Sequence, residues 1–268
     1  MDWEFSAIFL ALLLLEGLRR VPAGAVVLRR TGIGPWSVLL EEPGGRIHLT
    51  SLLPPFTRSL VLAPVSSEPP LDRALLESRW KTARRRAPWL SLVGSSVTAG
   101  LLIGLPLAAV RLTATGFLLT AAVVVGLTLS LAIAGIRTLR AIGLESKAAW
   151  RAGLRWFSPF AAPSVVEGVL ERALRGAPPV LAAELVLSPD AFRRWVRPRA
   201  YDLVEHRTAD GELAGLFDRP MLEGLVNAPP EYRDPTATTW CPRCGRSWTV
   251  DGECAECGVQ LKPLPVSR

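Results

Sequence analysis

The chain has 268 residues, a formal net charge of +7 from 31 Lys plus Arg against 24 Asp plus Glu, and 49% hydrophobic residues. Soluble nucleic-acid-binding proteins are basic but polar, and disordered chains are charged but poor in apolar residues, so neither class describes a chain with a mean hydropathy of +0.28. The apolar residues are concentrated in runs, which predicts a mainly α-helical membrane protein.

The first apolar run extends from Phe5 to Leu15. A cleaved signal peptide would have basic residues before this run, whereas here Asp2 and Glu4 precede it and arginines follow it. This order of charges favours a short hydrophobic anchor helix over residues 1–20 that spans the membrane with its N-terminus outside. An interfacial helix, or a span that needs a thin bilayer or a partner, is the alternative.

Residues 21–70 differ in pattern from the rest of the chain. Short apolar segments at 26–28, 36–40 and 46–52 are separated by turns rich in glycine and proline, a pattern typical of β-strands. Two or three such strands bury little apolar surface, so we expect a small cytoplasmic β module that another segment completes. The Pro- and Ser-rich residues 64–70 predict a linker.

Two long uncharged runs follow, at 87–110 and 112–136. A bilayer core of about 30 Å needs about 20 helical residues, so these runs predict a two-span transmembrane helical hairpin over residues 87–136. A pair of very apolar soluble helices is the alternative. No Asp, Glu, Lys, Arg or His lies inside either run, which argues against a transporter, a channel or an intramembrane protease.

Basic residues flank the hairpin on both sides. Residues 71–86 predict a basic amphipathic juxtamembrane helix, and the segment after the hairpin mirrors it. Because Lys and Arg mark the cytoplasmic side, we expect a multi-pass membrane protein with its C-terminus in the cytoplasm. These side chains could also hold anionic lipid headgroups, although topology alone would explain them. The flanking residues are Arg79, Lys81, Arg84, Arg85, Arg86, Arg137 and Arg140.

Small residues recur at every fourth position in both predicted spans. In lipid such stripes mark faces along which helices approach closely. We expect the two stripes to pack on each other as an antiparallel pair, and a homodimer interface is the alternative. The stripes consist of Ser96, Gly100, Gly104 and Ala108 in the first span and Ala122, Gly126, Ser130 and Ala134 in the second.

Residues 137–235 predict a cytoplasmic helical region. Helix start signals occur at Pro163-Ser164 and Ser188-Pro189-Asp190, and leucines and valines recur at helical spacing after them. A small helical bundle is the expected arrangement. Its helical carboxylates, such as Glu167, Glu171 and Glu184, are expected at the surface.

All four cysteines lie in two CxxC pairs that nine residues separate, namely Cys241, Cys244, Cys254 and Cys257. Four thiolates at this spacing can surround one Zn²⁺ tetrahedrally, and the glycine after each pair lets backbone amides turn toward sulfur. Disulfides are the alternative, but the expected cytoplasmic location is reducing. We therefore predict one structural zinc site within residues 236–268.

This tail resembles the zinc-ribbon family over about residues 239–264, with Trp248 between the two cysteine pairs. The resemblance implies a structural zinc, because four protein ligands leave no open position for catalysis. Rubredoxins, which bind iron, share the Cys-Pro-Arg-Cys-Gly sequence but separate their cysteine pairs more widely. The whole layout, with Gly-Leu-Arg-Arg-Val-Pro after the first helix, also resembles a group of bacterial membrane proteins with a terminal zinc ribbon and no assigned activity. This resemblance implies a location in the bacterial inner membrane.

The favoured function is a non-enzymatic membrane protein whose cytoplasmic zinc platform binds a protein partner, as a scaffold or accessory subunit. No HExxH, GxSxG or Walker motif is present, and the chain has only two histidines. A regulator that tethers nucleic acid or ribosomes through Arg243 and Arg246 is the first alternative. An enzyme of unknown reaction built from scattered carboxylates is the second.

Overall fold

The computed structural model describes residues 3–22, 25–32, 34–41, 47–49, 57–62, 72–177, 179–206, 223–224, 226–227 and 236–264. The chain divides into two compact units, Met1–Pro179 (unit 1) and Val180–Arg268 (unit 2). The division differs from the predicted domains, because residues 137–179 belong to unit 1 and the cysteine segment shares unit 2 with two helices. The predicted linker at 64–70 lies outside the described residues.

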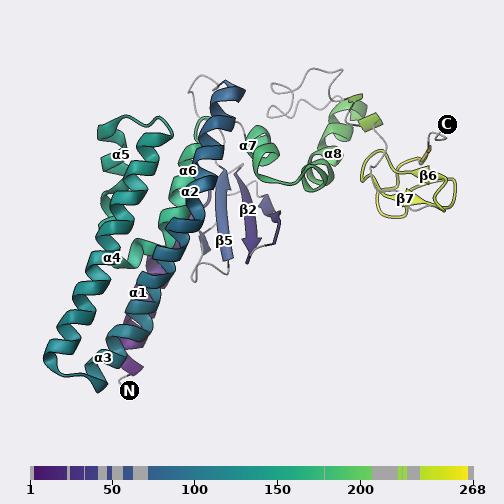
Figure 1. Ribbon diagram of the computed structural model, residues 1–268. Helices are drawn as coiled ribbons and strands as arrows, with labels where there is room; N and C mark the ends of the chain where they lie inside the picture. Colours follow the sequence, from purple (N-terminus) through teal and green to yellow (C-terminus); the bar gives the residue numbers. More distant parts are fainter. Residues whose placement is uncertain are drawn as a thin grey trace. The chain divides into compact units, whose positions relative to one another are not determined.

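Unit 1 is built on two antiparallel helical rods (Figure 1). The first comprises α2 (Arg73–Ala99), a π-helical turn (Gly100–Gly104) and α3 (Leu105–Arg111), and the second is α4 (Ala114–Ala141). Both rods are long and apolar enough to cross a membrane. The basic segment predicted as a separate helix over 71–86 is continuous with the first rod, because no break interrupts α2 after its N-cap at Asp72.

The π-helical turn precedes Pro106, where the sequence suggests a distorted helix. Proline lacks an N–H and its ring clashes with the preceding turn, so a helix commonly kinks or bulges beside it. Here the backbone N–H of Leu105 bonds to the carbonyl of Gly100, five residues earlier, which is the π-helical pattern. The turn to α4 then occupies Leu112 and Thr113, and the Thr113 hydroxyl accepts a hydrogen bond from the Gly116 N–H at 3.4 Å.

The N-terminal helix α1 (Trp3–Gly17) has 15 residues, about 22 Å, which is shorter than a bilayer core. It packs against the π-helical turn and against a 3-10 helix, η3 (Pro159–Ser164). Leu13 is buried, and the rings of Phe9 and Phe160 lie 5.9 Å apart. The helix is therefore part of the same helical assembly as the two rods.

The β module forms two small antiparallel sheets. Strands β2 (Val26–Thr31), β3 (Trp36–Glu41) and β5 (Thr57–Leu62) form a sheet in the order β3-β2-β5. The third predicted strand, over 46–52, is not in this sheet, because β4 (Ile47–Leu49) pairs with β1 (Leu18–Arg20). The completing strand is β5, which the sequence pattern did not reveal, and its inward side chains Leu60 and Leu62 are buried.

After α4 the chain turns at Gly143, whose φ of 91° requires glycine, and folds back along the rods. It forms α5 (Ser146–Gly153), η2 (Leu154–Phe157), η3 and α6 (Val165–Ala173). Every residue from 161 to 170 is buried. A Cβ on Gly94 would lie 3.1 Å from the carbonyl oxygen of Ala162, so this segment, predicted to be cytoplasmic, reaches the level of the predicted first span.

Trp156 anchors this returning segment and is fully buried. Added Cβ atoms on Gly135, Gly153 and Gly168 would lie 2.7, 3.4 and 3.1 Å from its ring. The indole is thus enclosed by glycines of α4, α5 and α6, and Arg172 lies over its face with 5.8 Å from guanidinium carbon to ring centre. A larger residue at Gly135 would displace the ring.

Unit 2 contains α7 (Pro179–Val186) apart from its first residue, α8 (Pro189–His206) and a sheet of three short strands. The strands are β6 (Thr239–Trp240), β7 (Ser247–Trp248) and β8 (Lys262–Pro263), in the order β7-β6-β8. Cys241, Cys254 and Leu261 form the buried cluster of this sheet. The two predicted helix starts near 164 and 188 both occur, but in different units.

Candidate metal centre

The four cysteine sulfurs of unit 2 converge on one point. They all lie within 4.8 Å of one another, and the sulfurs of Cys244 and Cys254 are 3.8 Å apart. A tetrahedral ion with sulfur ligands at about 2.3 Å requires sulfur-to-sulfur distances of about 3.8 Å, whereas a disulfide requires about 2.05 Å. All four cysteines are free thiols, and their arrangement fits a single tetrahedral metal ion.

Each cysteine pair is held by the same set of backbone hydrogen bonds. The N–H of Gly245 donates to the carbonyl of Cys241 at 2.8 Å, and the N–H of Gly258 donates to that of Cys254 at 2.8 Å. Both glycines have positive φ, 76° and 62°, which side chains rarely tolerate. Two equivalent loops therefore face each other, as the spacing of the cysteines predicts.

The surroundings shift the pKa values of three thiols in the cluster, and not all in the same direction. Burial raises the pKa of Cys244, and burial also raises that of Cys257. Burial opposes ionisation of Cys254 as well, but hydrogen bonds from the backbone of Glu256 and Cys257 outweigh it and lower the pKa of this thiol. Four thiolates cannot form together without a positive ion at the centre, and a bound metal supplies that charge.

An arginine of α8 lies beside the cluster. Arg197 is buried, and its guanidinium carbon is 5.1 Å from the ring centre of Trp240 on β6. A Cβ on Gly245 would lie 3.3 Å from Arg197 Nη1, so the glycine leaves room for the guanidinium. No sequence pattern indicates this contact, because Arg197 and Gly245 are distant in the chain and the helix around Arg197 is rich in other arginines.

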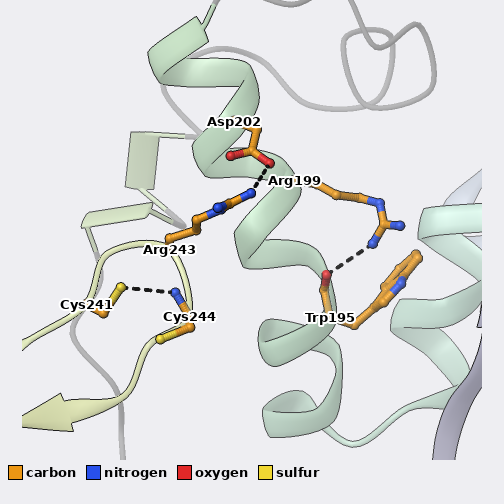
Figure 2. A network of polar contacts seen from close by, with 6 residues as sticks. All are labelled: Trp195, Arg199, Asp202, Cys241, Arg243 and Cys244. Atoms are coloured by element: carbon orange, nitrogen blue, oxygen red, sulfur yellow. Dashed lines mark hydrogen bonds and ion pairs between the residues drawn. The ribbon is translucent and has the colours of Figure 1, made fainter. Parts of the chain in front are cut away.

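The basic residues of the cysteine segment have partners within unit 2. Arg243 Nη2 lies 3.0 Å from a carboxylate oxygen of Asp202 on α8, and the two side chains point toward each other in Figure 2. Arg246 pairs with Glu256, and Lys262 donates to the side-chain oxygen of Asn227 at 2.8 Å. These cations are therefore engaged in contacts within the unit.

The arginines of α8 also make local contacts. Arg199 donates to the carbonyl of Trp195 at 3.3 Å and lies over the ring of that residue, 4.9 Å from its centre. Arg194 donates to the carbonyl of Asp190 at 3.3 Å. Figure 2 shows Arg199 directed toward Trp195 and Asp202 directed toward Arg243.

Two carboxylates that the sequence placed at the surface have a structural role in unit 1. Glu167 is fully buried and accepts a hydrogen bond from the Ser59 N–H at 3.0 Å, and Glu171 accepts one from the Val61 N–H at 3.2 Å. Four helical residues span about 6.0 Å and two strand residues about 6.8 Å, so the two repeats match. The carboxylates of α6 thus satisfy the open edge of β5.

The charge of Glu167 also acts on Arg58 of strand β5, where it is a minor influence. Burial lowers the pKa of Arg58, Arg30 lowers it further, and Glu167 acts in the opposite direction. Because both carboxylates already accept backbone N–H groups, they resemble parts of a scaffold more than a catalytic pair. The expectation that helical carboxylates four residues apart lie at the surface is wrong for Glu167.

The small-residue stripe of the first rod contacts α4 at several points. A Cβ on Gly100 would lie 2.7 Å from the side chain of Val124, one on Gly104 would lie 3.8 Å from Thr120, and Ala108 is buried. Ser96, by contrast, is exposed. The first stripe therefore follows the neighbouring rod over part of its length only.

The stripe of α4 does not face the first stripe. Gly126 has no neighbouring atom within 4 Å of an added Cβ, and Ala122 and Ser130 are exposed, whereas Ala134 is half-buried. The buried face of α4 carries Val124 and Thr128 instead. Gly100 of the first rod leaves the space that Val124 fills, so small residues of one rod meet larger residues of the other.

The predicted flanking basic residues lie on the two rods. Arg79 is half-buried, and the others are exposed, namely Lys81, Arg84, Arg85, Arg86, Arg137 and Arg140. Arg86 reaches from α2 to α4, where it donates to the carbonyl of Arg137 at 3.5 Å. The charged ends of the rods thus lie together.

Comparison of this chain with protein-family models, curated proteins and solved structures finds no match.

Proposed function

We propose that this chain is an integral membrane protein whose cytoplasmic unit 2 contains a structural zinc ribbon over residues 236–268 and binds a protein partner, as a scaffold or accessory subunit. The observation that carries the proposal is the convergence of four cysteine sulfurs within 4.8 Å in a chain that also has two membrane-length apolar rods. A metal site closed by four protein ligands stabilises a fold and leaves no position for a substrate.

The membrane location is supported by the apolar side chains that the rods leave exposed. In the most apolar window of α4 only 22% of residues are buried, whereas the core helix of a soluble protein is mostly buried. Leu118, Leu119 and Val123 are each more than 60% exposed. A continuous apolar surface of this kind requires lipid or another protein to cover it.

The cytoplasmic location proposed for unit 2 is supported by the basic ends of the rods. Arginines and lysines border the apolar segments at the end where α2 begins and α4 ends, and only Arg111 lies at the other end. The positive-inside rule assigns the basic end to the cytoplasm. Zinc-bound thiolates also persist more readily in that reducing compartment.

The two alternative functions receive less support. A nucleic-acid surface needs uncommitted cations, whereas Arg243, Arg246 and Lys262 all contact partners inside unit 2. An enzyme built on Glu167 and Glu171 would need their carboxylates for substrate, whereas both accept hydrogen bonds from strand β5.

The test is purification of the full chain at native expression from membranes in a mild detergent. We expect one zinc per chain, and a protein that co-purifies in stoichiometric amount with the wild-type chain. The C241S/C254S variant should lose both the zinc and the partner, while remaining in the membrane fraction. The control variant E253Q, at an exposed position between the cysteine pairs, should keep both.

A wild-type chain that is always recovered alone would contradict the scaffold. Salt-sensitive recovery of nucleic acid that R243E/R246E abolishes would favour the tethering alternative instead. A soluble chain that fractionates away from membranes would contradict the membrane location.

A further inference from the structure

Three arginines from two helices line one groove in unit 1. The groove has a volume of about 940 Å³ and lies between α2 and α4, with Arg85 and Arg86 from α2 and Arg137 from α4 in its wall. No carboxylate is among its lining residues. In the part of the chain that the structure describes, none of these three arginines forms an ion pair.

The groove changes from basic to apolar along the rods. Trp89 follows Arg85 by four residues on α2, and Ile133 precedes Arg137 by four on α4, so each apolar side chain lies about one helical turn from an arginine. Because the rods are antiparallel, both apolar side chains lie on the side of the arginines that leads toward the middle of the hairpin. Trp89 is 63% exposed and Ile133 is 41% exposed, so both are available for contact.

We propose that this groove binds an anionic phospholipid, whose phosphate is held by Arg85, Arg86 and Arg137 and whose acyl chain lies along Trp89 and Ile133. The guanidinium fork matches phosphate oxygens in a bidentate manner. Basic pockets between transmembrane helices on the cytoplasmic side suit such headgroups, and tryptophan suits the interface between headgroup and acyl chain.

The charge of the groove further restricts the lipid. Three arginines carry more positive charge than one phosphodiester neutralises, so a lipid with two phosphates should bind more tightly than a lipid with one. We expect the order diphosphatidylglycerol, then phosphatidylglycerol, then zwitterionic phosphatidylcholine. The exposed small residue Ser130 of α4 lines the apolar part of the groove, which gives the second predicted stripe a contact with lipid.

This inference rests on the membrane location in the proposed function, and the experiment separates the two. Membrane flotation of the wild-type chain and of each variant is measured first. The full-length protein is then purified in a neutral detergent, and native mass spectrometry measures the Kd for each of the three lipids. A wild-type chain that does not float contradicts the proposed function, whereas chains that float normally but bind lipids without preference contradict only this inference.

The decisive variant is R85Q/R86Q/R137Q. A cation near headgroups contributes about a fivefold factor in affinity, so the three changes should weaken binding of both anionic lipids about a hundredfold. The matched control K81Q/R84Q/R140Q removes three exposed charges from the same two helices outside the groove, and should change the Kd by no more than about twofold.

A second variant keeps the charges and fills the groove. S130W should weaken binding of the anionic lipids about tenfold by excluding part of an acyl chain. Equal weakening by the groove variant and its control would overturn the proposal, because it would indicate diffuse surface attraction. Displacement of the lipid by an equal concentration of glycerol 3-phosphate, or recovery of an acidic protein in the groove in place of lipid, would also overturn it.

Discussion

Each unit of this chain contains a three-stranded antiparallel sheet, and the two sheets are completed in different ways. The sheet β3-β2-β5 of unit 1 has its edge closed by carboxylates of α6, more than one hundred residues away. The sheet β7-β6-β8 of unit 2 has two-residue strands. The four cysteines beside it lie within 17 consecutive residues, from Cys241 to Cys257. Small sheets need such additional support, because two or three strands bury little surface.

The difference lies in where the stabilising groups come from. In unit 2 the stabilising groups are the four cysteines, which are close in sequence and of one chemical type. A chelator or a single cysteine substitution should therefore destabilise this sheet completely. In unit 1 the support is distributed over burial of Trp156, the edge hydrogen bonds and the two rods, so single changes should have partial effects. The predictions below test this contrast, beginning with the largest expected effect.

Removal of the proposed zinc should unfold the cysteine segment. Structural zinc contributes on the order of 10–16 kcal/mol to the folding of small domains, far more than two-residue strands can replace. We expect a strong chelator, or C241S, to make residues 236–264 sensitive to limited proteolysis while cleavage within unit 1 stays unchanged. A segment that resists protease after complete loss of metal would remove the distinction between the two sheets.

Trp156→Ala should be the most damaging single change in unit 1. Truncation of a buried tryptophan costs about 3–5 kcal/mol, because it leaves a cavity between α4, α5 and α6. The free energy of unfolding can be measured by denaturant titration in detergent micelles. Trp150→Ala is the matched control, since Trp150 is 45% exposed and should cost about 1 kcal/mol or less.

Glu167→Ala should lower the free energy of unfolding of unit 1 by about 1–3 kcal/mol, because the buried Ser59 N–H loses its acceptor. Glu171→Ala should cost about 1 kcal/mol, since that carboxylate is only half-buried. Glu167→Gln keeps a side-chain oxygen at the same place and should cost less than Glu167→Ala. Equal losses for the amide and the alanine variants would show that the edge hydrogen bond is unimportant.

The contact between Arg243 and Asp202 should have the smallest effect. Their side chains are 36% and 38% exposed, so solvent screens the pair, and a coupling of about 0.2–1 kcal/mol is expected. A double-mutant cycle of R243A and D202A on the unfolding of unit 2 measures this coupling, and high salt should reduce it. A coupling several times larger would mean that unit 2 depends on long-range ion pairs as well as on its cysteines.

Sequence patterns reveal local features well in this chain. The two apolar rods follow from the absence of charge over 87–110 and 112–136, and the clustering of the four cysteines follows from their spacing. Strands β2 and β3 follow from short apolar segments between turns. In each case the residues that determine the feature lie within a few turns or strand lengths of one another.

Long-range features could not be obtained in this way. Nothing near Glu167 indicates that its carboxylate meets Ser59, and nothing near Gly94 indicates that Ala162 lies beside it. The strand β5 has little alternation of its own, and its place depends on pairing with β2. The contact of Arg197 with Trp240 likewise depends on the return of the chain to α8.

The enclosure of Trp156 has a consequence for how this chain can evolve. Gly135, Gly153 and Gly168 belong to three different elements, yet a side chain at any of them would meet the indole or, at Gly153, the side chain of Ile136. A substitution at Gly135 therefore becomes tolerable only after the indole has been replaced by something smaller, and one at Gly153 also requires a smaller residue at Ile136. Among relatives, we expect these positions to change together or not at all, so that the indole and its glycines are inherited as one unit.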